Sequence, residues 1–515
     1  MSSVRAGTVH CAFVAQLRME DGPRTDVVDT TTYSYRLAND AGCASNGVCN
    51  YRKGDLWKRT NALGQVTEYV RYDSAGRVTR LKDANGVLTD MTYHLRGWLQ
   101  TSTVRVDPTG VPNAGDAITT LDYDDAGLVS RVTAPDGVYL DYTYDAAQRL
   151  TRITDSLGNR IDYTLDASGH RTAENTRDPG GQLKRTLGRI YDQLGRLDLS
   201  IDANLAETDH SYDANGNLTD LIDPLSTHTR QEYDPLNRLK KTIQDYDANA
   251  SSGLNVSTQY SYDAQDRLRT VTDPKGLDTT YTYDGLGNLT QLVSPDTGTT
   301  SYTYDAAGNR LTQTDARGVV TTYTYDALNR LRTQSNSADG EVLTHVYDIS
   351  GANGVCTQNS YGVGRLTRET DALGSVSYCY DARGNLLEKI RSSQLEPTGT
   401  PVTNELRYRV AYRYTLANQL AAVIYPDGDE LRYTRNSAGQ ITQVVYASQQ
   451  SNGSFLTETV VQSAQYAPFG PLTQLSFGNG SQWTRTWTRT TPSTRSPAPP
   501  SIWTPPSMMS ATSPA

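Results

Sequence analysis

Short polar and aromatic stretches alternate with Asp- and Gly-containing turns along most of this chain. The clearest unit covers residues 304–324. Within it, segments 310–314 and 319–325 are rich in Thr, Val and Tyr, residue types that favour β-strands. Segments 305–308 and 315–318 have the Asp-x-x-Gly composition of tight turns. The unit therefore predicts a β-hairpin, and nothing in it has a helical period.

The unit recurs at a fixed spacing. Tyr-Asp pairs restart every 21 residues from Tyr262 to Tyr325. A fixed period of this length is typical of a stacked array of small structural units. We assign ten Tyr residues as structural anchors of the repeat: Tyr72, Tyr144, Tyr191, Tyr212, Tyr233, Tyr262, Tyr283, Tyr304, Tyr325 and Tyr380.

The repeat divides the chain into three parts. The array is expected over residues 30–480, after an N-terminal segment, residues 1–29, without a clear assignment. Residues 481–515 contain no Asp or Glu and seven of the 21 Pro residues. That composition predicts a disordered tail, because it offers too little apolar surface to fold alone. The abrupt change of composition also favours the alternative of a tail that is read out of frame.

The repeat resembles the YD repeat of RHS proteins. The strings Tyr212-Asp-Ala-Asn-Gly-Asn-Leu-Thr219 and 304–312 carry the resemblance, which covers roughly residues 30–480. It implies an all-β ribbon of hairpins that spirals into a hollow shell, as in bacterial polymorphic toxins, toxin complexes and teneurins. In the bacterial members, the resemblance implies, the shell encloses a toxin or effector polypeptide.

The chain departs from that family plan in two respects. We find no core signature and no folded domain after the repeats, so we expect a portion of a shell without its protease or toxin.

Asp273-Pro-Lys-Gly-Leu277 matches the short string at which relatives cleave themselves. It occupies the second turn of an ordinary repeat, which favours a turn over a cleavage site.

Composition and net charge limit the kinds of partner that this chain is expected to bind. The net charge is −9 and no basic cluster is present, which excludes a typical nucleic-acid binder. The hydrophobic fraction is 36%, but 34 Tyr against 4 Phe indicates a core that is apolar in body and polar at its tips. No apolar run is long enough to span a bilayer, and the N-terminus does not read as a signal peptide.

No residue pattern indicates catalysis, so we assign no catalytic, cofactor-binding or metal-binding residues. The many Asp residues stand in turns, and the calcium-like string from Asp213 lacks the Gly and Glu that an EF-hand requires at Leu218 and Pro224. The six His residues are scattered; His94 and His170 stand in turns without a partner that the sequence identifies. Two Cys pairs, Cys43 with Cys49 and Cys356 with Cys379, are candidates for disulfides. The fifth Cys is Cys11.

Two functions follow as hypotheses. The first is a non-catalytic shell segment whose partners are an encapsulated effector polypeptide or the rest of an RHS shell. The alternative is a cell-surface or secreted adhesion module that binds a glycan or a protein through exposed Tyr rows and long loops. Both place a bacterial protein outside the cell or on its surface.

Overall fold

One continuous antiparallel ribbon makes up the protein. The structure, a computed structural model, describes residues 17–44, 47–249, 253–351, 354–395 and 401–485. Within them it contains 38 strands in one sheet and a single short 3-10 helix, η1 (Ala41–Cys43). Each strand pairs with the next one in chain order, as β25 does with β24 and β26. The predicted all-β array is confirmed.

The strands have the following bounds. The first half of the ribbon comprises β1 (Met19–Glu20), β2 (Thr31–Tyr35), β3 (Leu56–Thr60), β4 (Val66–Tyr72), β5 (Val78–Lys82), β6 (Leu88–Tyr93), β7 (Leu99–Val104), β8 (Ala117–Tyr123), β9 (Val129–Thr133), β10 (Tyr139–Tyr144), β11 (Leu150–Asp155), β12 (Arg160–Leu165), β13 (Arg171–Arg177), β14 (Leu183–Tyr191), β15 (Leu197–Ile201), β16 (Glu207–Tyr212), β17 (Leu218–Ile222), β18 (His228–Tyr233) and β19 (Leu239–Gln244). The second half comprises β20 (Val256–Tyr262), β21 (Leu268–Thr272), β22 (Asp278–Tyr283), β23 (Leu289–Ser294), β24 (Gly298–Tyr304), β25 (Arg310–Thr314), β26 (Val320–Tyr325), β27 (Leu331–Asn336), β28 (Val342–Tyr347), β29 (Leu366–Asp371), β30 (Gly374–Tyr380), β31 (Leu386–Leu395), β32 (Pro401–Tyr414), β33 (Leu420–Ile424), β34 (Glu430–Arg435), β35 (Ile441–Gln449), β36 (Phe455–Tyr466), β37 (Leu472–Phe477) and β38 (Gln482–Thr484).

The hairpin of the repeat forms as its composition predicts. In the unit that begins at Tyr304, the strands are β25 and β26, so the second strand starts one residue later than expected. Gly308 closes the first turn with φ 82°, and Asn329 takes the same place in the next repeat with φ 60°. Both conformations lie in the left-handed region that Gly and Asn tolerate best.

Two kinds of turn alternate, so the ribbon has two different edges. Turns that follow the strand ending in Tyr form what we call the Tyr-Asp edge, and the turns at the opposite end of each hairpin form the Asp-Gly edge. A β-bulge precedes the Tyr: Thr303 pairs with Thr312, but Tyr304 pairs with Arg310. Because a bulge adds twist and bends a strand, its repetition at one edge is expected to curve the ribbon.

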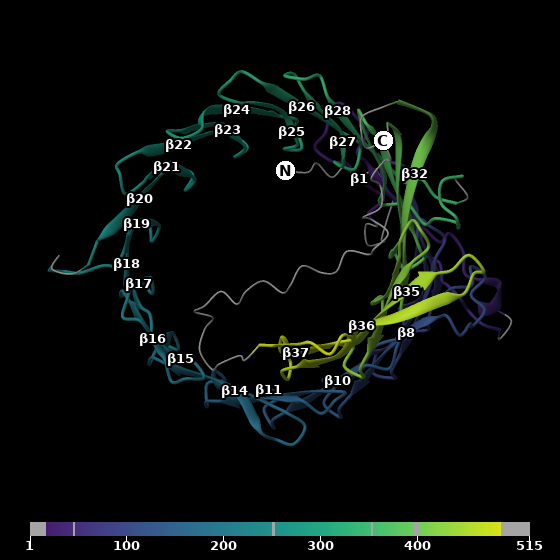
Figure 1. Ribbon diagram of the computed structural model, residues 1–515, viewed down its shortest axis with the longest axis horizontal. Helices are drawn as coiled ribbons and strands as arrows, with labels where there is room; N and C mark the ends of the chain where they lie inside the picture. Colours follow the sequence, from purple (N-terminus) through teal and green to yellow (C-terminus); the bar gives the residue numbers. More distant parts are fainter. Residues whose placement is uncertain (1–16, 45–46, 250–252, 352–353, 396–400, 486–515) are drawn as a thin grey trace, which may run out of the picture.

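The ribbon curves into a ring around an open centre and then overlaps itself (Figure 1). Strands β25–β28 return to the neighbourhood of β1, and β35–β37 lie over the part of the ring that contains β8–β11. Hydrogen bonds between turns about one revolution apart show that the first and second revolutions lie edge to edge.

Burial is concentrated late in the chain. Most strand residues are half-buried, as expected for a single layer covered only by its own side chains. The four most buried apolar residues, by contrast, lie in strands β30, β31, β33 and β35: Cys379, Ile390, Ala422 and Ala447. These strands form the broadest part of the wall, on the right of Figure 1.

Candidate functional site: the Tyr-Asp turns, the seam and the hollow

The hydroxyl of the Tyr in a Tyr-Asp pair reaches back to the preceding repeat. Tyr212, at the end of β16, donates a hydrogen bond of 2.8 Å to the carbonyl of Leu197, the first residue of β15. Tyr325 donates in the same way to Arg310, at 3.0 Å, and burial raises the pKa of its hydroxyl. Each bond gives a partner to a carbonyl near the end of a strand, and it ties consecutive repeats together.

The other predicted anchors occupy the same position. The same hydroxyl-to-carbonyl bond is made by Tyr72, Tyr144, Tyr191, Tyr233, Tyr262 and Tyr380. Tyr283 and Tyr304 end β22 and β24, and burial raises the pKa of both hydroxyls. Sequence periodicity alone does not identify the carbonyl that each hydroxyl binds.

The Asp of each pair builds the turn, and the residue four positions later joins it to the next repeat. One carboxylate oxygen of Asp263 accepts from the backbone N–H groups of Gln265 and Arg267, and the other accepts from the Arg267 side chain at 2.7 Å. The Arg267 guanidinium also donates to the carbonyl of Asp284, at 2.7 Å, and lies 4.8 Å from the centre of the Tyr283 ring. Burial alone would raise the pKa of Asp263, but these hydrogen bonds and the Arg267 charge hold it below its usual value.

Asn replaces Arg in several turns and keeps the connection. Asn217 donates to the Asp213 carboxylate at 2.8 Å and to the side-chain oxygen of Asn237 at 2.9 Å. The calcium-like string from Asp213 is therefore an ordinary turn of the repeat. Within the part of the chain that the structure describes, no group of three or more His, Cys, Asp or Glu could hold a metal ion.

One turn deviates and lies beside a cavity. Leu165 stands in the Tyr place, and His170 stands where other turns have Arg or Asn. His170 pairs with Asp166 at 2.9 Å and stacks on the ring of Tyr191, with ring centroids 4.7 Å apart. A cavity of about 710 Å³ lies beside it, lined also by Arg189. The buried Nη1 of Arg189 has no hydrogen-bond partner among the described residues.

The two revolutions meet along what we call the seam, where the Tyr-Asp edge of the second lies on the Asp-Gly edge of the first. Asn85 and Val363, 278 residues apart, exchange two hydrogen bonds of 3.0 and 2.8 Å. Ser156 donates to the carbonyl of Ser437, 281 residues away. The nearly constant separation indicates that one revolution of the ribbon takes about 280 residues.

Arg24 anchors the seam near the start of the chain. Its guanidinium donates to the carbonyl of Asp326 at 2.6 Å and lies 3.5 Å from the carboxylate of Asp305. The Arg24 side chain is only 3% exposed. A hydrogen bond to Asp26 is the largest of the effects that raise the pKa of Arg24, which stays charged inside the seam.

A further seam contact joins Gln65 to Asp348. Asp348 also accepts from Arg330 at 2.6 Å and from the backbone of Gly364 at 2.7 Å. Burial alone would raise the pKa of Asp348, but the hydrogen bonds from Arg330, Gly364 and Gln65 and the charge of Arg330 lower it. The carboxylate is therefore held in its charged form.

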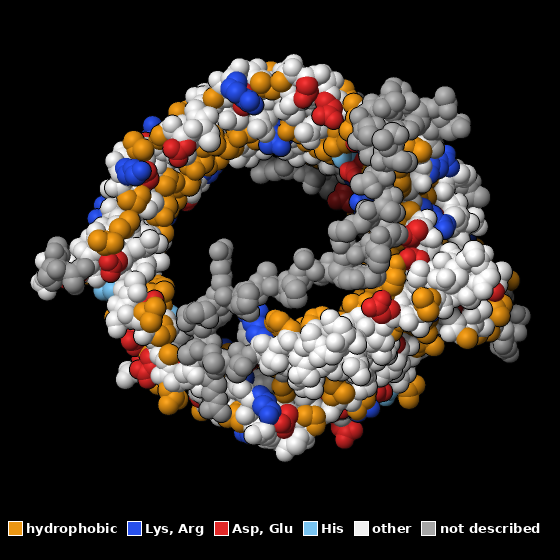
Figure 2. All heavy atoms as spheres, viewed as in Figure 1, with side chains coloured by type: hydrophobic (Ala, Val, Ile, Leu, Met, Phe, Trp, Pro, Cys, Tyr) orange, Lys and Arg blue, Asp and Glu red, His pale blue; other side chains and the backbone are white. Residues whose placement is uncertain are grey.

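The ring encloses a hollow that opens toward the viewer in Figure 2, where polar and hydrophobic side chains both line the rim. Most of the wall around it is one ribbon thick. An enclosure of this kind can hold material. The string Asp273–Leu277 lies in an exposed turn, where Asp273 accepts from the backbone of Lys275 and Leu277.

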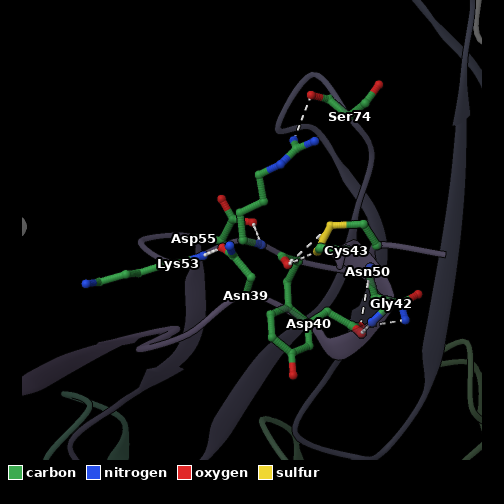
Figure 3. The surroundings of a disulfide bond; sticks show 11 residues. Asn39, Asp40, Gly42, Cys43, Asn50, Lys53, Asp55 and Ser74 are labelled. Carbon is green, nitrogen blue, oxygen red and sulfur yellow. Dashed lines mark hydrogen bonds between the residues drawn. A yellow bond between two sulfur atoms is a disulfide. The ribbon is translucent and has the colours of Figure 1, made fainter. Parts of the chain in front are cut away.

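Both candidate disulfides are present in the structure. Cys43–Cys49 closes a short loop after η1, where Asp40 accepts from Gly42 and from the Asn50 side chain, each at 2.8 Å (Figure 3). Cys356–Cys379 ties a long loop to β30, and Cys379 is almost completely buried. Cys11 lies outside the described residues.

Comparisons with known proteins agree with this architecture. The family model of the teneurin YD-shell matches residues 166–402, and that of the RHS repeat matches residues 52–88, 72–111, 123–160 and 144–183. The chain belongs to the RHS/YD-repeat family. Comparison with curated proteins gives no match.

Solved structures show the same fold. The crystal structure of TcdB2-TccC3 without its hypervariable C-terminal region superposes with a TM-score of 0.69, at 13% identity over 92% of this chain. The Tc holotoxin pore of Photorhabdus luminescens gives a TM-score of 0.67, at 13% identity over 92%. This chain spans 29% of the length of each of those chains. None of its described residues forms a helix long and apolar enough to cross a membrane.

Proposed function

We propose that this chain is a non-catalytic segment of a shell wall that encloses a poorly folded effector polypeptide outside the bacterial cell or at its surface. The observation that carries the proposal is the ring: a ribbon that curves around a hollow and locks its second revolution onto its first through the seam. The Tyr anchors and Asp turns hold neighbouring repeats together, and Arg24, Asn85 and Ser156 hold the revolutions together. The other partner of such a segment is the rest of an RHS shell.

A protection experiment tests containment. The full chain is refolded with a fluorescent polypeptide that is reduced and carboxymethylated and therefore cannot fold, and protease is then added. We expect the shell chain to slow digestion of this probe, and to have little effect on digestion of the same polypeptide with its disulfides intact and folded, because only the unfolded form can enter the hollow. Equal digestion rates with and without the shell chain would refute containment.

A matched variant separates enclosure from surface adsorption. Arg24→Met loosens the seam without changing the repeats, so it should reduce protection of the unfolded probe. Negative-stain microscopy of the same samples should show rings with an open centre for the unmodified chain. Protection that is unaffected by Arg24→Met would indicate adsorption to the outer surface.

A second function, carbohydrate binding, is favoured by the cavity beside His170. Its lining offers an unpaired donor on Arg189, an acceptor on Asp166 and the aromatic side chains of His170 and Tyr191. A sugar is complementary to this lining, because its hydroxyls accept and donate hydrogen bonds and its ring faces stack on aromatic groups. A glycan array followed by titration of any hit against His170→Ala and Arg189→Ala tests it. His228→Ala, a change outside the cavity lining, is the control.

A further inference from the structure

The seam shows that the two edges of the ribbon are complementary to each other. In each of these seam contacts, the Tyr-Asp edge supplies one partner and the Asp-Gly edge the other: Asp326 receives Arg24, Val363 meets Asn85, and Ser437 receives Ser156. In all three, a backbone carbonyl at the Tyr-Asp edge accepts from a side chain at the Asp-Gly edge.

The exposed fractions of the leucine side chains at the turn tips show where the edges are covered. On the Asp-Gly edge, Leu157 lies at the seam and is 36% exposed, whereas Leu225, at the same place in a later turn, is 86% exposed. On the Tyr-Asp edge, Leu286 of the first revolution is 78% exposed, whereas Leu328 lies at the seam and is half-buried. Contact between the edges thus covers apolar surface as well as forming hydrogen bonds.

Each edge has a long uncovered stretch. The free Asp-Gly stretch carries Leu205 and Leu225, and the free Tyr-Asp stretch carries Leu95, Leu194, Leu236 and Leu286. Figure 2 shows hydrophobic side chains along the rim over β19–β24. Rows of exposed leucines on a single molecule are unusual for surface that stays in water, and they favour an interaction surface.

We propose that a second copy of this chain docks its free Tyr-Asp edge onto the free Asp-Gly edge of the first, so that copies stack along the ring axis. The seam indicates that the partner is a second copy, because the Tyr-Asp edge and the Asp-Gly edge of a single chain already bind each other there. The free stretches of the two edges continue directly from the stretches that meet at the seam. The two halves lie on different surfaces, so the contact is heterologous and does not close on itself. Stacking continues the spiral from copy to copy. It goes beyond containment, because it concerns the rims and does not depend on what fills the hollow.

Two complementary variants test the direction of stacking. Leu225→Asp damages only the Asp-Gly edge, and Leu286→Asp damages only the Tyr-Asp edge. We expect the unmodified chain to form a concentration-dependent series of oligomers in sedimentation velocity. Each variant alone should associate at least about tenfold more weakly, since a charge replaces an apolar contact at the centre of the interface. Mixed in equal amounts, the two variants should form a dimer and stop there, because each retains one intact edge.

The control is Gln259→Asp, which introduces the same charge on the exposed face of β20, in the middle of that strand and away from both edges. It should leave the oligomer series unchanged, and circular dichroism should show β-structure in all variants. A chain that stays monomeric at the highest attainable concentration would overturn the proposal and point to a different polypeptide on this edge. Variants that retain the oligomer series, or a mixture that grows beyond the dimer, would overturn it as well.

Discussion

The guanidinium of Arg24 donates a 2.6 Å hydrogen bond to the carbonyl of Asp326, 302 residues further along the chain. One buried side chain thereby joins the start of the first revolution to the second. The carboxylates of Asp26, at 2.5 Å, and Asp305, at 3.5 Å, balance its charge. The ring is consequently held by a long-range contact that no repeat contains by itself.

Arg24→Met should be strongly destabilising. It removes the donor from the Asp326 carbonyl and leaves the carboxylate of Asp305, 8% exposed, without its cation. Removing one partner of a buried ion pair costs about 3–5 kcal/mol. Chemical denaturation followed by circular dichroism measures this as a lower unfolding midpoint.

The matched control for Arg24→Met is Arg317→Ala. Arg317 also pairs with an Asp, Asp315 at 2.7 Å, but its side chain is 81% exposed. Exposed pairs contribute about 0–1 kcal/mol. If the two variants unfold at the same denaturant concentration, the seam does not stabilise the ring.

Tyr325→Phe tests the anchor hydroxyls. The change keeps the ring and removes only the hydrogen bond to the carbonyl of Arg310. A lost hydrogen bond of this kind costs about 1 kcal/mol, because the carbonyl is left unsatisfied. Tyr408→Phe, at a side chain that is 45% exposed, should be nearly neutral in the same denaturation experiment. A neutral Tyr325→Phe would mean that the anchors act through their rings alone.

The sequence predicts the local structure well, because hairpins are set by neighbouring residues. Strand composition and the Asp-x-x-Gly turns predict the same bounds for β25 as the structure has, and the bounds of β26 to within one residue. The contacts of the candidate site are harder to predict from the sequence. The partner of Arg24 lies a full revolution away, and that distance follows from the curvature that accumulates over many bulges. The cavity beside His170 lies between two neighbouring turns, with its lining drawn from residues 166–172 and 189–195, and the sequence does not show how those turns are placed relative to each other.

Removing the two disulfides should have unequal effects. Cys356 and Cys379 are 23 residues apart, whereas Cys43 and Cys49 are 6 apart. Since the loss of unfolded-chain entropy grows with the loop that is closed, replacing the first pair by Ser should cost about 3 kcal/mol and the second about 2 kcal/mol. Denaturation with and without reductant checks the order. If the variants are equally stable, or if reductant leaves the unmodified chain unaffected, the bonds are not present in solution.

Acid should loosen the seam through Asp348. Its pKa lies below the usual value in the folded protein, because the hydrogen bonds from Arg330, Gly364 and Gln65 and the Arg330 charge outweigh its burial. A carboxylate with a depressed pKa contributes stability that is fully present above its unfolded pKa, about 3.9. That contribution is lost as the pH falls through the folded pKa, when protonation ends the ion pair with Arg330. We therefore expect the unfolding midpoint to fall between about pH 5 and the folded pKa of Asp348.

Asp348→Asn identifies the group responsible. Asn cannot form the ion pair, so this variant should be less stable at neutral pH and should lose less further stability on acidification than the unmodified chain. Asp315→Asn is the comparison, because its carboxylate also has a lowered pKa, chiefly from its hydrogen bond to Arg317, but Arg317 is 81% exposed and the pair takes no part in the seam. This variant should change the acid dependence much less than Asp348→Asn does. If Asp348→Asn retains the full decline in acid, titration of other turn carboxylates controls the stability of the ring.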